Sequence, residues 1–227
     1  ESVAEITRAS PIEGAAPVML SVQPTSMRSS QLIGGGRTTV LKVNYRNTAQ
    51  ILAFARRFAS DVIGAPGTTA DDEQAILLPE DAGRQGLVPE VRRCVSIDAE
   101  VHCVPEWLIG RRKAGYEWPQ MACLYPEHWI GERVAQILAK HGVPFDLAKN
   151  NKNRVSTKRA AIRLLSLHTA KGLEFPCVAI AGLGFLGRHG ETIDECVRLT
   201  YVGVTRATHE ALLTYSSESA LVQRLIA

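Results

Sequence analysis

The chain has 227 residues, of which 45% are hydrophobic and 22% charged, and its formal net charge is +3. This composition excludes a disordered tail and is sufficient for a sizeable core in one large or two small domains. The mildly basic balance permits a nucleic-acid partner without requiring one. No apolar run is long enough to span a bilayer, and no signal core follows the acidic start at Glu1 and Glu5, so we expect a cytosolic protein without a membrane anchor.

Residues 1–37 contain scattered Pro, Ser and Gly and no initiator methionine, so we expect an irregular lead-in that continues from a missing N-terminal domain. Residues 38–43 (TTVLKV) predict a strand, and residues 49–62 predict a helix that Asn47-Thr48 can cap. Tyr45 and Arg46 therefore lie at a strand-to-helix turn. In an open α/β sheet, ligands bind at the carboxyl ends of strands, so we expect a site there.

Beyond a connection at residues 64–90, strand and helix signals alternate, which predicts an α/β fold with a mostly parallel sheet and helices on both faces. Lys149 to Arg154, with Lys158 and Arg159, form a basic stretch that we interpret as a surface loop able to touch phosphates. The expected strands are residues 91–97, 121–125, 161–167, 177–181 and 211–215, and the expected helices are residues 98–113, 127–141, 194–208 and 217–226.

Five cysteines, at positions 94, 103, 123, 177 and 196, are odd in number and widely spaced. They indicate neither a disulfide framework nor a Cys-x-x-Cys zinc site. We therefore expect no metal ligands from this chain.

Two short motifs carry the chemistry, LHTAKGLEF at residues 167–175 and RLTYVGVTRA at residues 198–207, together with NYR at 44–46. They supply two arginines, a carboxylate and an aromatic ring suited to a nucleoside triphosphate. No phosphate-cradling loop accompanies them, because the glycines at 34–36 have no Gly-Lys-Ser/Thr ending and precede a strand. The acidic residues 71–73 lack the apolar strand that would aim a magnesium ligand.

The strings HTAKGLEF (168–175) and YVGVTRA (201–207) resemble motifs V and VI of the UvrD/Rep/PcrA family of superfamily-one DNA helicases, and LKVNYR (41–46) resembles motif IV. The resemblance implies that residues 38–227 are the second RecA-like motor domain, lacking a P-loop of its own. Many relatives insert a large helical subdomain where this chain has a short basic excursion at 145–160. The roles of that insertion should not be transferred.

The resemblance also implies roles for individual residues. Arg206 would be the arginine finger and Arg46 a second γ-phosphate contact, a task that suits guanidinium because it stays charged and offers fixed donors. Tyr45 would stack on adenine, and Glu174 would accept from the ribose hydroxyl. Surface ion pairs for the arginines, a core position for Tyr45 and a helix-start carboxylate for Glu174 are the structural alternatives.

The remaining implied site residues are two glycines and the start of motif V. Gly172 and Gly203 would allow close backbone approach or unusual dihedral angles at the nucleotide. His168 and Thr169 would face single-stranded DNA, and Lys171 would support the turn or meet a phosphate. A lone histidine is more often structural.

These residues predict the C-terminal motor domain of an ATP-dependent DNA helicase. ATP and Mg²⁺ would be held by an N-terminal P-loop domain of the same polypeptide, and single-stranded DNA would be the partner. The isolated chain should hydrolyse no ATP, because it lacks both Walker motifs. The alternative is a freestanding degenerate half that acts as a non-enzymatic nucleic-acid-binding or docking module. The presence of Arg46, Glu174 and Arg206 together argues against such decay.

Overall fold

A computed structural model of the chain describes residues 43–44, 46–63, 80–81, 83–148 and 160–227, which all belong to one compact unit of residues 40–227. The expected lead-in at residues 1–37, Tyr45 and the basic residues 149–159 lie outside the described residues, as does most of the expected strand at 38–43. Expectations about these segments stay predictions.

A six-stranded sheet forms the centre of the fold, with the order β3-β8-β7-β4-β6-β5 and parallel pairing throughout. This confirms the predicted α/β class. A separate pair of short strands, β1 (Val43–Asn44) and β2 (Glu80–Asp81), is also parallel. The six strands are β3 (Glu90–Arg93), β4 (Met121–Tyr125), β5 (Phe145–Leu147), β6 (Ile162–Ser166), β7 (Phe175–Ile180) and β8 (Ala207–Tyr215).

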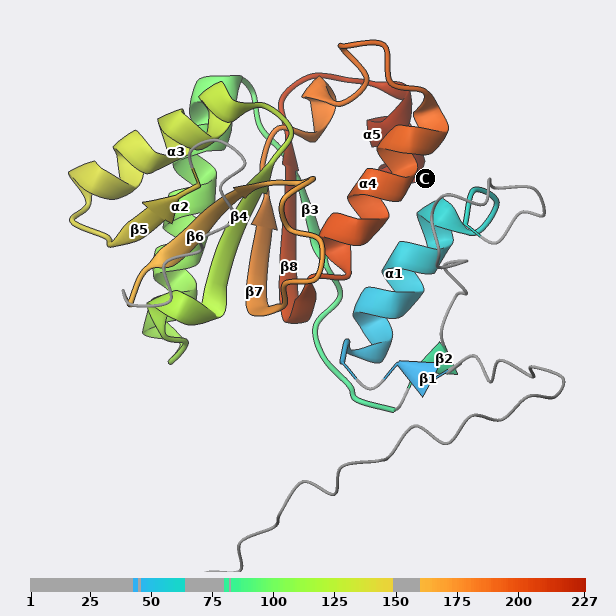
Figure 1. The fold of residues 1–227 in the computed structure, drawn as a ribbon, viewed down its shortest axis with the longest axis horizontal. Coiled ribbons are helices and arrows are strands. Elements are labelled where there is room, and N and C mark those ends of the chain that lie inside the picture. The colour runs from blue at the N-terminus through green and yellow to red at the C-terminus, as the bar shows by residue number, and fades with distance from the viewer. Residues whose placement is uncertain (1–42, 45, 64–79, 82, 149–159) are drawn as a thin grey trace, which may run out of the picture. The chain divides into compact units, whose positions relative to one another are not determined.

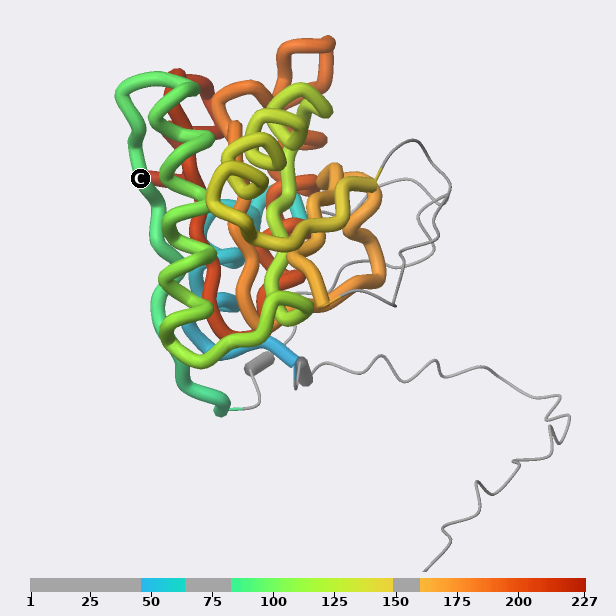
Figure 2. Tube along the Cα trace, turned by 90° about the vertical axis from the view of Figure 1, so that its left-hand side faces the viewer, coloured from blue at the N-terminus to red at the C-terminus, as the bar shows by residue number. Residues whose placement is uncertain are grey.

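Helices cover both faces of this sheet (Figure 1). The first face packs against α1 (Ala49–Ala59), α4 (Ile193–Val204) and α5 (Ala220–Ile226). Figure 2 looks from the side that carries the second pair, α2 (Ile97–Lys113) and α3 (His128–Lys140). None of the described helices has both the length and the apolar character needed to cross a membrane.

Successive side chains of a strand point to opposite faces of the sheet, which explains how one sheet contributes to two hydrophobic clusters. In β4, Leu124 packs in the cluster beneath α1 and α4, whereas Cys123 and Tyr125 pack in the cluster beneath α2 and α3. All five β4 residues are buried, as expected of a central strand covered on both faces. The continuous apolar strings therefore encode a doubly covered sheet.

Several element boundaries differ from the sequence-based expectation. The second helix begins at Ile97 because Ser96, rather than Asp98, caps it by accepting a hydrogen bond from the Ala99 amide. The helix expected to reach Thr208 ends at Val204, and Ala207 already belongs to β8. Phe145–Leu147, which we placed in the basic excursion, forms the edge strand β5.

The pairing of β7 with β8 contains a bulge near the start of both strands. Phe175 pairs with Ala207, but Cys177 pairs with Glu210, so the register shifts across Pro176. Proline has no amide hydrogen to donate to the ladder and is tolerated at such bulges. The irregularity lies beside the residues that form the candidate site.

Candidate functional site

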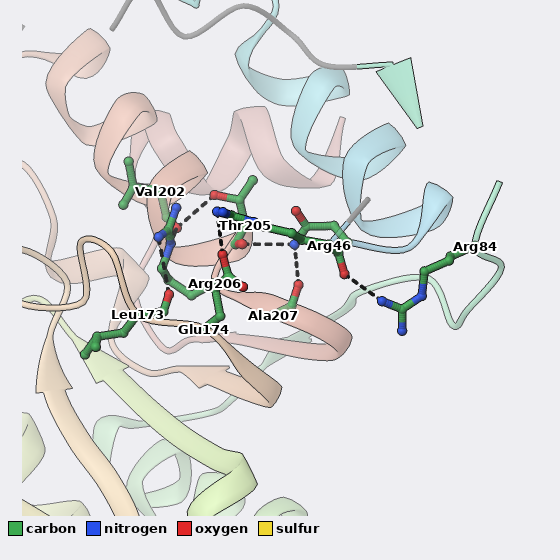
Figure 3. Close-up of polar contacts among 9 residues, drawn as sticks. Arg46, Arg84, Leu173, Glu174, Val202, Thr205, Arg206 and Ala207 are labelled. Carbon is green, nitrogen blue, oxygen red and sulfur yellow. Dashed lines mark hydrogen bonds and ion pairs between the residues drawn. The ribbon is translucent and has the colours of Figure 1, made fainter. Parts of the chain in front are cut away.

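Arg46, Glu174 and Arg206 converge on one rim of the described domain, although Arg206 lies 160 positions after Arg46 in the sequence. Arg46 Nη1 lies 2.7 Å from Glu174 Oε1, and the Arg46 side chain is 71% exposed (Figure 3). Glu174 immediately precedes β7, and Arg206 immediately precedes β8. The structure thus brings together the three charged residues that the motifs predicted for one site.

The rim is built from two kinds of strand end. Arg46 follows the short strand β1, in agreement with the expected strand-to-helix turn, whereas Glu174 and Arg206 lie at the amino ends of β7 and β8. The Phe175 amide donates to the Arg206 carbonyl at 2.9 Å, which fixes the two strand starts side by side. Arg46 follows β1, which is not part of the six-stranded sheet.

Arg206 is held in place by main-chain carbonyl groups. Its Nε donates to the Val202 carbonyl at 3.0 Å and its Nη1 to the Leu173 carbonyl at 3.3 Å (Figure 3). Burial, assisted by the neighbouring Arg46, lowers the pKa of Arg206 from its usual value, while Glu174 opposes that shift. Because arginine starts from a pKa above 12, Arg206 keeps its positive charge at neutral pH.

Asn47 is a residue whose importance the sequence analysis missed. Its Nδ2 donates to the carbonyls of Thr205 and Ala207, at 2.9 and 2.5 Å, and the residue is 2% exposed. These two carbonyls flank Arg206. Because Asn47 is the next residue after Arg46 in the chain, its side-chain amide holds the Arg206 loop close to Arg46. We expected Asn47 to share in capping the first helix, but the Thr48 side chain performs the capping.

Arg84 is a second missed residue at this rim. Its Nη1 donates to the Arg46 carbonyl at 3.1 Å, and its Nη2 lies 3.1 Å from His209 Nε2 (Figure 3). His209 belongs to β8, so Arg84 ties the Arg46 main chain to that strand. It lies in the stretch that we interpreted only as a connection.

The two glycines have conformational and packing roles. Gly172 has a φ of 82°, which favours glycine because a side chain would be strained there. A Cβ on Gly203 would lie 2.6 Å from Leu167 Cδ2, so α4 can approach the sheet closely at this point. Neither observation concerns a nucleotide directly.

His168 and Thr169 lie just after the carboxyl end of β6, and Lys171 lies further along the connection, three residues before Glu174. His168 and Lys171 are exposed, whereas Thr169 is fixed by hydrogen bonds to Ser166. The segment 167–174 then runs to the amino end of β7, with β4 lying between β6 and β7 in the sheet. Motif V thus runs from the carboxyl end of one strand to the amino end of another.

The side of the sheet where the carboxyl ends of the strands lie, called the carboxyl edge below, also carries a cluster of aromatic and basic side chains. Trp129 is 38% exposed and meets Phe185 edge-on, with ring centroids 5.2 Å apart. The Arg188 guanidinium lies 4.0 Å from the centroid of the same phenylalanine ring. Rings and cations in this arrangement can stack on bases and meet phosphates. No group of three or more His, Cys, Asp or Glu residues in the described part of the chain could hold a metal ion.

The fold of this domain is shared with a solved structure. It matches the crystal structure of the C-terminal domain of a possible DNA helicase from Lactobacillus plantarum WCFS1, with a TM-score of 0.58 and 22% sequence identity. The match covers 80% of this chain and 94% of that one. The chain therefore has the fold of a helicase C-terminal domain.

Sequence comparisons show which helicases part of this chain resembles. Residues 145–218 match the UvrD-like helicase C-terminal domain. DNA helicase II of Escherichia coli K12 is 41% identical over 75 residues, which are 30% of this chain and 10% of that protein. PcrA of Bacillus subtilis 168, an ATP-dependent DNA helicase, is 39% identical over 82 residues, or 33% and 11%. The chain spans about a tenth of the length of these relatives. The resemblance to the C-terminal half of UvrD-type helicases is confirmed for this region.

Proposed function

We propose that this chain is the C-terminal motor domain of an ATP-dependent DNA helicase, and that Arg206 and Arg46 contact the γ-phosphate of ATP bound to an N-terminal P-loop domain. The convergence of Arg46, Glu174 and Arg206 on one rim carries the proposal. The rim fits the charge of the nucleotide, since two guanidinium groups suit phosphate oxygens and a carboxylate suits ribose hydroxyls. Bound ATP would supply the transferable phosphoryl group, and Mg²⁺ would be held by the other domain.

The two arginines are prepared differently for this task. Arg206 is partly buried and aligned by the Val202 and Leu173 carbonyls, so little conformational freedom is lost when it meets charge developing on a phosphate. Arg46 is exposed and paired with Glu174. An exposed pair is worth about 0–1 kcal/mol, so Arg46 can exchange Glu174 for a phosphate at small cost. We infer that Arg206 is the fixed finger and Arg46 the adjustable contact.

The carboxyl edge is the proposed surface for single-stranded DNA. Lys171 and Arg188 supply positive charge for the phosphates, and Trp129 offers a ring for stacking. His168 and Thr169 lie where this edge meets the segment that leads to Glu174. A shift at the DNA surface would therefore reach the nucleotide rim through motif V.

DNA-stimulated ATPase measurements on the full-length polypeptide test the nucleotide role. Arg206→Ala should lower kcat about 10³-fold, the usual effect of losing an arginine finger, while the protein stays folded. Arg133→Ala provides a matched control, because Arg133 makes a surface ion pair with Asp98 on α2 and should leave kcat unchanged. Unchanged turnover in Arg206→Ala would refute the assignment. An inactive but DNA-binding full-length protein would favour the non-enzymatic module.

A separate binding measurement tests the DNA surface. Fluorescence anisotropy with an oligothymidylate at several salt concentrations should show that Lys171→Ala weakens binding and reduces the salt slope by about one. Lys113→Ala, at the far end of α2, is the control and should leave the slope unchanged. Equal effects of the two variants would contradict the proposed surface.

A further inference from the structure

Two cysteines and an arginine lie on one face of the edge strand β3 and its neighbour α2. Arg92 and Cys94 are two residues apart in an extended segment, so their side chains share a face. Arg92 Nη1 donates to Cys103 Sγ at 2.9 Å. Cys103 is also a neighbour of Cys94, since it contributes to raising the pKa of that thiol. Val91, of opposite parity, packs instead against the cluster beneath α1 and α4. The two thiols and the guanidinium therefore form one group.

The two sulfur atoms have different surroundings. A cationic donor stabilises negative charge on sulfur, and Arg92 is itself oriented by Glu90, whose Oε1 accepts from Arg92 Nε at 2.8 Å. Burial, together with the adjacent Cys103 and Glu100, raises the pKa of Cys94 to about 12. Cys103, which accepts the hydrogen bond from Arg92, is thus assigned as the thiol that reacts first, and Cys94 as the thiol that resolves it.

Access to solvent also separates this pair from cysteines deeper in the sheet. Cys94 and Cys103 are 8% and 9% exposed, whereas Cys123 and Cys177 are 0% exposed. All four are free thiols. The chain therefore contains its own unreactive reference cysteines.

We propose that Cys94 and Cys103 form an oxidisable dithiol, a modification site at which hydrogen peroxide produces an intramolecular disulfide. The Cys103 thiolate attacks one peroxide oxygen, the S–O bond forms, the O–O bond breaks, and the departing hydroxide is protonated to water. Cys94 sulfur then attacks the Cys103 sulfenic acid. The S–S bond forms, the S–O bond breaks, and the released hydroxide takes the Cys94 proton as a second water. The two sulfurs lose two electrons in total, and the peroxide gains them.

The disulfide would join the end of the edge strand β3 to the second turn of α2. Arg92 is not part of the nucleotide rim or of the proposed DNA surface. The inference is therefore independent of the proposed function and can be tested on the 227-residue chain itself.

Peptide mass spectrometry after peroxide treatment provides a direct test. Trypsin cleaves after Arg93 and Arg111, so Cys94 and Cys103 fall in a single peptide, residues 94–111. After oxidation, alkylation under denaturing conditions and digestion, this peptide should lack both alkyl groups and weigh two hydrogen atoms less than the dithiol form. Dithiothreitol should reverse the change, and Cys123 and Cys177 should be alkylated throughout. A fully alkylated peptide 94–111, or sulfinic acid on Cys103 beside an alkylated Cys94, would overturn the proposal.

Single substitutions test the order of the two steps. In Cys94→Ser, dimedone should trap a sulfenic acid on Cys103, whereas in Cys103→Ser residue Cys94 should stay reduced. Arg92→Gln should slow disulfide formation by about threefold or more, because the cationic donor is lost. Glu90→Gln keeps that donor and is the matched control, with an unchanged or faster rate. Trapping on Cys94 instead, or equal rates in Arg92→Gln and Glu90→Gln, would contradict the assigned roles.

Discussion

Replacing Asn47 by alanine should both destabilise the domain and loosen Arg206. The substitution removes the donor shared by the Thr205 and Ala207 carbonyls. A buried polar group left without a partner costs about 1–3 kcal/mol. The Thr205 contact is only partly buried, so water can replace one donor, while the Ala207 contact is buried. We therefore expect the free energy of unfolding to fall by about 2–3 kcal/mol.

Urea denaturation of the 227-residue chain, followed by circular dichroism, measures this loss. Gln50→Ala is a matched control, because Gln50 is also an amide that makes hydrogen bonds near the start of α1, but its partners are exposed. Its effect should stay within about 0.5 kcal/mol, as is usual for surface positions. If Asn47→Ala is no more destabilising than Gln50→Ala, the hydrogen bonds from Asn47 to the Thr205 and Ala207 carbonyls do not stabilise the domain. In the full-length polypeptide, the same substitution should lower kcat more than it raises KM, because Arg206 would lose its alignment.

Two further predictions concern helix packing and helix capping. Gly131→Ala should destabilise the domain by about 1–3 kcal/mol, because a Cβ there would lie 2.3 Å from the ring of the buried Tyr125. In the control Gly110→Ala, the new Cβ meets no neighbour within 4 Å, so the domain should gain about 0.5–1 kcal/mol from helix propensity. Thermal or urea unfolding of both variants measures the two effects. The Thr192 amide and hydroxyl lower the pKa of Glu195 from 4.5, so its capping contribution to α4 is present at neutral pH and is lost as the pH falls through the lowered value. Stability measured against pH should therefore decline less steeply below pH 4.5 in Glu195→Gln, and identical acid profiles would contradict the capping role.

The sequence was most informative where burial imposes a simple pattern. The apolar string at residues 121–125 predicted the central strand correctly, because a strand covered on both faces must be apolar throughout. The short strand β5 was missed, since Phe145-Asp146-Leu147 is only half-buried and precedes a polar stretch. Three residues at a sheet edge carry too little pattern to be distinguished from a loop.

The candidate site was predictable by residue identity but not by position. Arg46, Glu174 and Arg206 could be chosen from their motifs, but local sequence does not give the order of strands in a sheet, and the pairing of β7 with β8 is what brings Glu174 and Arg206 together. Asn47 was missed for a related reason. Its partners are main-chain carbonyls of a distant loop, and such groups leave no signature in the amino-acid sequence.

A short connection between β6 and β7 joins the proposed DNA surface to the proposed nucleotide rim. Coupling between distant sites in a domain is carried by packed side chains, hydrogen-bond networks and rigid elements. Five residues lie between His168 and Glu174 in the chain, and one of them, Ala170, is buried in the core. In the proposed function, a displacement of His168 on binding DNA would reach Glu174 along these five residues, and the hydrogen bonds of Thr169 and the burial of Ala170 limit how far the stretch can deform.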